Sequence, residues 1–345
     1  MAPPSINCNE EINWDEIGFG IVPTDSMYMM KCSTEEDTFS EGTLVPYGNL
    51  HLTPSAGILN YGQGVIEGLK AYRSKDGRIV MFRPEENGRR MKIGAERMCM
   101  PSPSVEQFVK AVKQTVLANK RWVPPLGKGS LYIRPLLMGT GSVLGLVPAP
   151  EYTFLIYVTP VKTYHKGPLN LVIKDKLYRA ISGSGGTGGI KSVVNYSPAY
   201  KALKEARAEG FSDILYLDAA TGKFVEELSS CNIFLVKGKA ISTPTAGGNN
   251  ILPGITRKSI IEIAIDLGYE VMEGEVGVDE LMEADEVFCT GTAVGVNPVA
   301  SITHNNNRAE YKTGPEAVSQ KLLQTLVGIQ TGHIQDTRGW TLQIE

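Results

Sequence analysis

The sequence predicts an α+β protein with two domains. The chain has 345 residues, and a domain usually contains roughly 100–200 residues. Segments typical of strands and of helices follow one another without strict alternation, which favours mixed sheets over a doubly wound parallel sheet. Proline, glycine and lysine separate two apolar strand candidates at 160–168. We therefore expect a smaller amino-terminal α/β domain at 1–159, an interdomain loop at 160–168 and a carboxyl-terminal domain at 169–345.

The first half of the chain contains strand signals and one strong helix signal. Strands are expected at 78–83, after the turn dipeptide Asp76-Gly77, at 131–137 and at 153–161. Residues 104–120 predict an amphipathic helix, because apolar side chains recur there at helical spacing. Ser104 and Gln107 have the spacing of a capping box, so this helix should begin just after Ser104.

The second half continues with strands and helices in irregular succession. Strands are expected at 169–173, 213–217, 231–236 and 286–289, and helices at 256–267 and 316–329. Gly268 should end the first of these helices. Another helix should open at Ser197-Pro198 and close at Gly210, because proline favours the first helical position and glycine the position after the last.

Composition excludes several functional classes. Apolar residues make up 42% and charged residues 21%, which is ordinary globular usage and excludes a disordered chain. The net charge of −3 gives no basic surface for nucleic acids or acidic membranes, and the apolar runs are too short to cross a bilayer. Five cysteines and four histidines are dispersed, so we expect reduced thiols and no metal site.

The first 30 residues carry five acidic residues and no lysine or arginine. Secretory signals need a basic segment, and transit peptides are rich in arginine and poor in acidic residues. Neither pattern is present, so we expect a cytoplasmic protein, although a shortened chain would give the same pattern.

The densest chemical signal is the segment 182–196, SGSGGTGGIKSVVNY, in which five glycines precede Lys191. Glycines let backbone amides approach an anion closely, and a lysine beyond them could bind phosphate or form an imine. The P-loop of nucleotide-binding proteins needs glycine directly before the lysine, whereas Ile190 intervenes here. This disfavours a P-loop protein, and a surface loop with an exposed lysine remains the structural alternative.

Three further clusters could each contribute to a ligand site. Glu226-Glu227 precede an apolar strand, where a carboxylate could pair with a cationic ring nitrogen or simply end a solvated turn. Residues 252–257 lead into a helix whose first amides could bind an anion or only cap the helix. Residues 289–293 place small side chains after a strand, where backbone amides could contact a ligand.

Taken together, these clusters resemble the branched-chain amino-acid aminotransferases, which are pyridoxal-phosphate enzymes of fold type IV. The resemblance covers nearly the whole chain and is strongest to plant members. It rests on the joint order of Asn13-Trp14-Asp15-Glu16, LNYGQG at 59–64, EGLKA at 67–71, Phe82-Arg83-Pro84, LYIRP at 131–135, GGIK at 188–191, Asn232-Ile233-Phe234 and IQTG at 329–332. It implies a carboxyl-terminal domain that binds the cofactor, a cofactor site at the domain interface and a homodimer.

The resemblance implies pyridoxal phosphate as the cofactor and assigns residues to it. Lys191 would form the internal aldimine and later move a proton on the substrate. Glu227 would pair with the pyridine nitrogen, and Tyr196 would lie near the phenolic oxygen of the ring. The phosphate would be bound by Arg90, Thr292 and the backbone amides of Ile255 and Thr256.

The resemblance also implies a substrate site. Tyr132 and Arg134 lie two apart on a strand and so share one face. They would surround the substrate carboxylate together with Tyr61 and the amides of Thr292 and Ala293. The side-chain pocket would be lined by Ile66 and Tyr164, and by Leu144 and Leu146 reaching across from the other subunit.

The implied activity is transfer of an amino group between leucine, isoleucine or valine and 2-oxoglutarate, and no nucleic acid or membrane partner is expected. A methionine-oxo-acid transaminase remains the alternative, because the sequence does not give the pocket size. D-amino-acid aminotransferases and aminodeoxychorismate lyases share the fold, but the Tyr132–Arg134 strand favours the branched-chain group. Mammalian members carry a CxxC thiol switch where this chain has Val294 and Asn297, so we expect no such switch.

Overall fold

The computed structural model describes residues 12–33, 38–162, 164–181, 183, 185–247 and 250–344, so Cys8, Ser182 and Ser184 lie outside the described residues. Contacts divide the described chain into two compact units. The first unit contains the residues up to Tyr164, Lys191–Val193 and the residues from Gly328 onward, and the second contains His165–Ile190 and Val194–Val327. The sequence analysis placed all of 169–345 in one domain, whereas the structure groups two segments of that range with the first unit.

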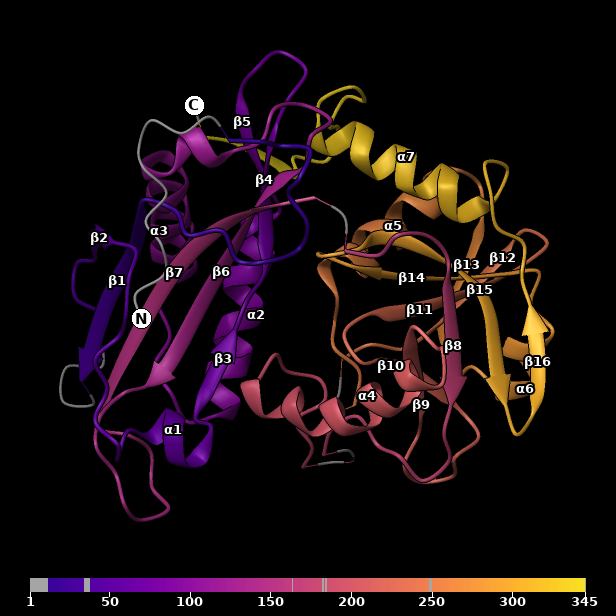
Figure 1. Cartoon of the computed structure of the whole chain (residues 1–345), viewed down its shortest axis with the longest axis horizontal. Coiled ribbons are helices and arrows are strands. Elements are labelled where there is room, and N and C mark those ends of the chain that lie inside the picture. Colours follow the sequence, from indigo (N-terminus) through magenta and orange to yellow (C-terminus); the bar gives the residue numbers. More distant parts are fainter. Residues whose placement is uncertain are drawn as a thin grey trace. The chain divides into compact units, whose positions relative to one another are not determined.

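The first unit is built on an antiparallel sheet (Figure 1). Its strands are β1 (Ser26–Ser33), β2 (Thr43–Pro46), β3 (Gly64–Ile66), β4 (Leu69–Arg73), β5 (Ile79–Phe82), β6 (Ser130–Gly139), β7 (Glu151–Val161) and β17 (Thr341–Gln343). They run in the order β17-β5-β4-β6-β7-β1-β2, with β3 paired to β6. β17 joins the sheet because it pairs antiparallel with β5, which explains why the end of the chain belongs to this unit.

Helices cover one face of this sheet. They are α2 (Pro84–Arg97) and α3 (Val105–Ala118), while α1 (Gly57–Tyr61) and a 3-10 turn (Lys120–Trp122) lie in connecting segments. Met91 of α2 and Phe108 of α3 share a buried core with Ile133 and Phe154 of the sheet. Side chains of a strand alternate between faces, so Tyr132 and Arg134 lie on the face opposite this core.

The second unit contains a mixed sheet that closes on itself. Its strands are β8 (Leu169–Ile173), β9 (Asp213–Leu217), β10 (Val225–Leu228), β11 (Asn232–Lys237), β12 (Ala240–Pro244), β13 (Glu270–Gly274), β14 (Glu286–Gly291), β15 (Gly295–His304) and β16 (Asn307–Glu310). The order is β10-β9-β8-β15-β14-β11-β12-β13, and β16 pairs with β15. An additional pairing of β10 with β11, at Glu227 and Asn232, closes a ring of strands around a buried core.

The remaining helices are α4 (Tyr200–Ala208), α5 (Ile255–Asp266), α6 (Val278–Met282) and α7 (Val318–Gln330), with 3-10 turns at Val193–Asn195 and Ser197–Ala199. They belong to the second unit, except for Val193 and the residues of α7 from Gly328 onward. α4 packs Ala202 and Ala206 against Ile214 of β9. The predicted opening at Ser197-Pro198 is therefore a 3-10 turn that leads into α4. No helix within the described residues is long and apolar enough to cross a membrane.

Most expected elements agree with the structure. β8 and β9 have the predicted bounds, and the capping box at Ser104 and Gln107 is present at the start of α3. The mixed parallel and antiparallel pairing of the second sheet confirms the α+β class. α2, which carries Arg90, was not predicted, because charged residues dominate its sequence and its buried face consists mainly of small and polar residues, with Met91 as its one large apolar side chain.

Candidate active site

Lys191 lies on the edge of β3 in the first unit. The Ile66 N–H donates to the carbonyl oxygen of Lys191 at 2.9 Å, and the Ser192 hydroxyl donates to the Gly64 carbonyl at 3.2 Å. A bridge between Val65 and Ser192 completes this attachment. The backbone of the glycine-rich segment is therefore fixed at the lysine itself, and Lys191 is half-buried rather than on an open surface loop.

Tyr132 and Arg134 lie together on β6, as the strand periodicity predicts. A guanidinium nitrogen of Arg134 donates to the Tyr132 hydroxyl at 3.3 Å, and the guanidinium carbon lies 5.3 Å from the centre of the tyrosine ring. Tyr132 is buried, and a Cβ on Gly68 would overlap its hydroxyl. Glycine at position 68 thus leaves room for the ring that orients Arg134.

Lys70 is a residue that the sequence analysis did not assign to the site. It pairs with Tyr132 across β4 and β6, and its neighbours Leu69 and Ala71 point into the core. Alternation therefore places Lys70 on the same face as Tyr132 and Arg134. Lys70 is 9% exposed, and burial lowers the pKa of its ammonium group to about 8. A lysine between two core residues of a strand is the sequence signal that could have identified it.

An aromatic cluster continues from Tyr132. Phe19 packs edge-on against Tyr132, with ring centres 5.6 Å apart, and against Tyr164, with ring centres 4.7 Å apart. Phe19 therefore joins two residues that the sequence analysis had assigned to different parts of the substrate site. These contacts of Phe19 were not predicted, because it lies in an irregular segment without a periodic signal.

Arg90 lies on α2 and is held by a buried carboxylate. Its Nε and one terminal nitrogen each donate to Glu67 at 2.7 Å, and Glu67 is fully buried. Asn87, one turn earlier on α2, donates to the same carboxylate at 2.7 Å. A bidentate pair of this kind fixes the plane of the guanidinium group. A phosphate ligand was expected at Arg90 from the sequence, and its pairing with Glu67 was not predicted.

Tyr61, Leu144 and Leu146 form a more exposed group in the first unit. The Tyr61 hydroxyl donates to the Leu144 carbonyl oxygen. The side chains of Leu144 and Leu146 are 91% and 90% exposed. Two leucines in one loop with nearly complete exposure are unusual for a surface that contacts only water.

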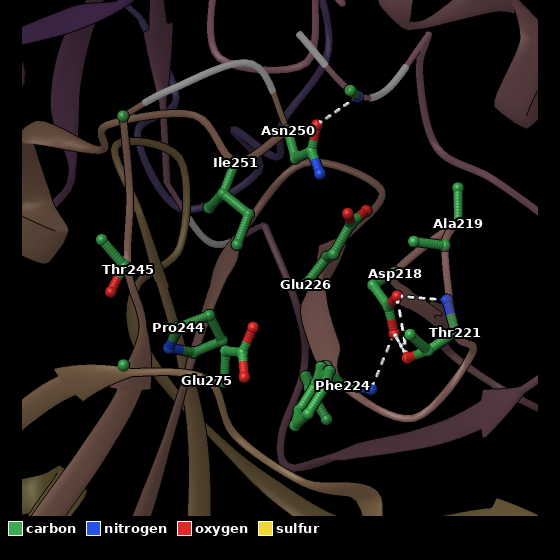
Figure 2. Close-up of a pocket in the computed structure, with 15 residues that line it drawn as sticks. Asp218, Ala219, Thr221, Phe224, Glu226, Pro244, Thr245, Asn250, Ile251 and Glu275 are labelled. Carbon is green, nitrogen blue, oxygen red and sulfur yellow. Dashed lines mark hydrogen bonds between the residues drawn. The ribbon is translucent and has the colours of Figure 1, made fainter.

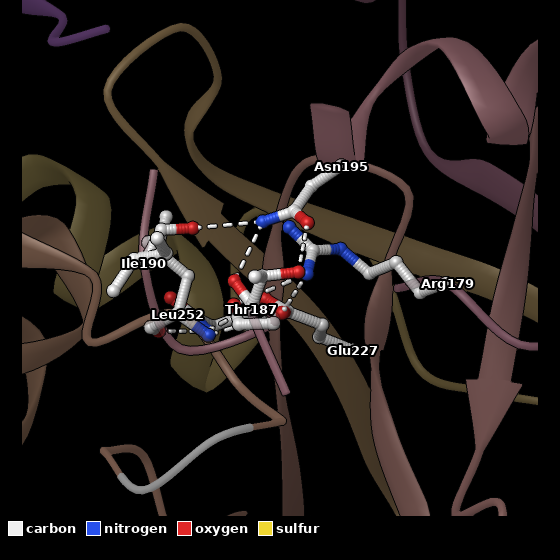
Figure 3. A network of polar contacts seen from close by, with 8 residues as sticks. Arg179, Thr187, Ile190, Asn195, Glu227 and Leu252 are labelled. Carbon is white, nitrogen blue, oxygen red and sulfur yellow. Dashed lines mark hydrogen bonds and ion pairs between the residues drawn. The ribbon is translucent and has the colours of Figure 1, made fainter. Parts of the chain in front are cut away.

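Glu227 lies at the point where β10 and β11 close the ring of the second unit (Figure 3). It is 1% exposed and forms an ion pair of 2.7 Å with Arg179, which is 2% exposed. The Leu252 N–H and the Asn232 amide also donate to its carboxylate, at 3.0 and 3.2 Å. Arg179 and Asn232 thus hold the Glu227 carboxylate in one orientation. Neither role was predicted. Arg179 is 48 residues from Glu227 in the chain, and Asn232, only five residues away, reaches the carboxylate because β10 and β11 pair.

Asn195 fixes the glycine-rich segment from within the second unit (Figure 3). Its amide nitrogen donates to the carbonyl oxygens of Thr187 and Ile190 at 2.7 and 2.9 Å, and its oxygen accepts from the Thr187 hydroxyl at 2.8 Å. Tyr196, the expected neighbour of the cofactor ring, follows directly and is half-buried. The loop before Lys191 is therefore a hydrogen-bonded structure.

The first turn of α5 has the features of an anion site. Gly254 precedes the helix without a side-chain cap, and no acidic residue occupies the first turn. A Cβ at Gly254 would overlap the amide oxygen of Asn232, so this helix start lies against the side chain that holds Glu227. Uncapped helix N-termini attract phosphate groups. Ile255 and Thr256 are both buried there.

The expected site residues divide between the units. The first unit contains Lys191, Arg90, Tyr61, Ile66, Tyr132, Arg134, Tyr164, Leu144 and Leu146, and the second contains Tyr196, Glu227, Ile255, Thr256, Thr292 and Ala293. Thr292 and Ala293 occupy the half-buried turn between β14 and β15.

Among the described residues, no group of three or more acidic, histidine or cysteine side chains could hold a metal ion.

Comparison with known proteins identifies the family. Residues 64–302 match the Amino-transferase class IV family. The chain is 60% identical to a chloroplastic branched-chain-amino-acid aminotransferase of Arabidopsis thaliana, over 97% of this chain and 86% of the relative. It is also 60% identical to a mitochondrial branched-chain amino acid aminotransferase of Humulus lupulus (97% and 85% covered), and 51% identical to a methionine aminotransferase of A. thaliana (97% and 94% covered).

Solved structures agree with these relatives. The fold is similar to that of the Escherichia coli branched-chain amino acid aminotransferase, with a TM-score of 0.79, 27% identity and coverage of 93% of this chain and 100% of that one. The T.th. branched-chain amino acid aminotransferase, solved with pyridoxamine 5'-phosphate, gives a TM-score of 0.77 at 28% identity, covering 94% and 100%.

These comparisons correct one expectation. The prediction of a cytoplasmic protein is wrong, because several relatives at about 60% identity are chloroplastic or mitochondrial. The relatives are longer than this chain, which covers 86% of the A. thaliana enzyme. The acidic beginning of this chain is therefore no guide to targeting.

The family model, the plant relatives and the solved structures therefore agree with one another. The chain belongs to the class IV aminotransferases and, within them, to the branched-chain-amino-acid aminotransferase family.

Proposed function

We propose that the protein transfers the amino group between the branched-chain L-amino acids leucine, isoleucine and valine and 2-oxoglutarate, in a ping-pong reaction with pyridoxal phosphate. The observation that carries the proposal is the 60% identity, over 97% of this chain, to a plant enzyme named for that activity. The buried network around Glu227 and the substrate-facing side chains of β6 support it.

The side chains present fit pyridoxal phosphate. A buried carboxylate suits a protonated ring nitrogen, and an uncapped helix start suits a phosphate. When bound, the cofactor withdraws electrons from the substrate Cα and so eases loss of its proton. Glu227 would accept the ring N–H, with Arg179 holding the carboxylate in place. The phosphate would be bound by Arg90, Thr292 and the amides of Ile255 and Thr256.

The Lys191 amine has the central chemical role in this proposal. It would bind the cofactor covalently at rest, and after release it would carry a proton from the substrate Cα. The main-chain bond from Ile66 to Lys191 limits the position of this amine. Tyr196 would lie beside the phenolic oxygen, next to Asn195, which holds the preceding loop.

On the substrate side, Arg134 and Tyr132 would bind the carboxylate, assisted by Tyr61 and by the amides of Thr292 and Ala293. The contact between Arg134 and the Tyr132 hydroxyl, at 3.3 Å, supports a shared role. Ile66 and the Phe19–Tyr164 pair would contact the alkyl side chain. Lys70, on the same strand face as Arg134, would add positive charge for the second carboxylate of 2-oxoglutarate or glutamate.

The alternative is a methionine transaminase, which is favoured by the methionine aminotransferase that is 51% identical to this chain. Both activities use the same machinery and differ only in the side-chain pocket. A kcat/KM comparison of leucine, isoleucine, valine and methionine with 2-oxoglutarate tests the proposal. Higher values for the three branched-chain substrates support it, and a higher value for methionine would support the alternative.

We also propose a homodimer in which Leu144 and Leu146 line the substrate pocket of the partner subunit. Their nearly complete exposure supports this, because a partner would remove two large apolar side chains from water. Sedimentation at assay concentrations should give a dimer, and a fully active monomer would refute shared sites.

A further inference from the structure

The second unit contains a cavity to which the proposed reaction assigns no role (Figure 2). Its volume is about 700 Å³, within the range of roughly 300–1,000 Å³ typical of sites for small organic ligands. It lies where the turn 218–224, between β9 and β10, meets the segments around Pro244 and Ile251. None of the residues assigned above to the cofactor or the substrate lines it.

The cavity has one buried charged anchor. Glu226 lines it and is 6% exposed, and its Oε1 has no hydrogen-bond partner among the described residues. Figure 2 shows the carboxylate in the middle of the lining residues, below Asn250. A buried acceptor without a donor is costly in free energy. The Glu226 side chain lines the cavity, so a ligand that enters there can supply the donor that this carboxylate oxygen lacks.

The other polar groups of the cavity are engaged or exposed. Asp218 accepts from the backbone N–H groups of Thr221 and Phe224, at 2.6 and 2.8 Å, and so stabilises its own turn. The Asn250 oxygen accepts the Gly183 N–H at 2.8 Å. Glu275 lines the rim and is exposed. Glu226 is therefore the group that a buried ligand would meet.

The electrostatic surroundings favour a cationic ligand. Burial and the negative charges of Glu227 and Asp218 raise the pKa of Glu226 to about 7, against the smaller opposing effects of a side-chain hydrogen bond with Asn250 and of the positive charge of Arg179. None of the described residues that line the cavity is a lysine, arginine or histidine. A positively charged donor would relieve the repulsion between these carboxylates, whereas an anion would add to it.

The residues that line the cavity determine which class of cation fits it. Phe224, Pro244 and Ile251 present apolar surface beside Glu226. A metal ion needs several ligating oxygens or nitrogens, and the described residues form no such group here. A free amino acid brings a carboxylate that the three acidic side chains would repel. An alkylammonium ion combines one charged donor with an apolar body and meets every requirement.

We propose that this cavity binds a small alkylammonium ion whose N–H donates to Glu226 and whose alkyl group packs on Phe224 and Ile251. The site is separate from the proposed reaction and does not depend on it. A suitable probe is N,N-dimethylbutylammonium, because a tertiary amine cannot form an imine with an aldehyde cofactor. Butan-1-ol is the matched probe without the charge.

Titration calorimetry on the cofactor-loaded enzyme tests the proposal. At pH 8.5 the ammonium probe should bind at least tenfold more tightly than butan-1-ol. Binding should weaken about tenfold at pH 6, where roughly one tenth of the Glu226 carboxyl groups remain ionised. An absence of saturable heat with the ammonium probe, or equal binding of the two probes, would overturn the proposal without the use of any variant.

Two variants locate the site. Glu226→Gln should weaken the ammonium probe at least tenfold and abolish its pH dependence, because the amide keeps the shape and removes the charge. Glu275→Gln, a change at the exposed rim of the same cavity, should leave the affinity within twofold of the original. Unchanged binding by Glu226→Gln, or an equal loss in both variants, would contradict a buried site at Glu226.

Discussion

Lys70 on β4 allows a quantitative test of burial in the first unit, since a buried amine makes the free energy of unfolding depend on pH. The side chain is 9% exposed, and burial lowers its pKa from 10.5 to about 8. Between these values the folded protein binds fewer protons at Lys70 than the unfolded chain does. The stability of the folded state therefore rises with pH between about 8 and 10.5, and the full cost of the buried charge is present below pH 8.

The magnitude follows from the shift. A difference of about 2.5 pKa units corresponds to about 3 kcal/mol, at 1.36 kcal/mol per unit. Methionine has a similar length and no charge, so Lys70→Met should raise the free energy of unfolding by about 3 kcal/mol at pH 7. At pH 10 the gain should fall below about 1 kcal/mol, because there the lysine of the unfolded chain has begun to lose its proton.

Urea unfolding of the cofactor-free protein, at one fixed protein concentration, measures this difference. Tryptophan fluorescence is the suitable signal, because Trp14, Trp122 and Trp340 all belong to the first unit, as Lys70 does. Lys75→Met, which changes an exposed lysine two residues beyond β4, is the control and should have little effect. If Lys70→Met did not raise the free energy of unfolding at pH 7, or raised it equally at pH 7 and pH 10, the cost assigned to the buried charge of Lys70 would be refuted.

Three further predictions concern the proposed site. Glu227→Gln should slow transamination about 10- to 150-fold, because a charge-assisted hydrogen bond contributes about 1.5–3 kcal/mol. Cofactor binding should weaken less than the reaction slows. If Glu227→Gln had a mild effect and Glu226→Gln abolished activity, Glu226 and not Glu227 would be the residue that pairs with the ring nitrogen. Glu67→Gln should lower the free energy of unfolding by about 3–5 kcal/mol, because it leaves Arg90 buried without its counter-charge; an unchanged urea midpoint would argue against this pair. Leu144→Asp should raise the KM for leucine or weaken self-association and leave the absorbance spectrum unchanged, and an altered spectrum would place Leu144 near the cofactor instead.

Features that depend on neighbouring residues in the sequence could be predicted well. The capping box of α3 is made by Ser104 and Gln107, three residues apart, and both of its hydrogen bonds are present. The strands β8 and β9 are short apolar runs bounded by turn residues, and their bounds agree with the prediction. In these segments the local hydrogen bonds and the burial pattern favour the same structure.

Features that depend on distant partners could not be predicted. Arg179 and Glu227 are 48 residues apart in the chain and meet because β10 closes the ring of strands. Glu67 and Arg90 meet because α2 packs against β3 and Glu67 is the residue directly after β3. The pairing of β17 with β5 returns the end of the chain to the first unit. Each contact depends on the whole topology, and no local pattern in the sequence indicates it.

We propose above that Lys191 binds the cofactor covalently, and this bond can be tested directly. The purified enzyme should absorb in the near-ultraviolet to violet region, and borohydride should abolish this band and fix the cofactor on the peptide that contains Lys191. Lys191→Ala, which removes the amine and leaves the backbone bond from Ile66 possible, should bind some cofactor without covalent attachment and lose several orders of magnitude in activity. Attachment at another lysine, or near-normal turnover by Lys191→Ala, would contradict the account.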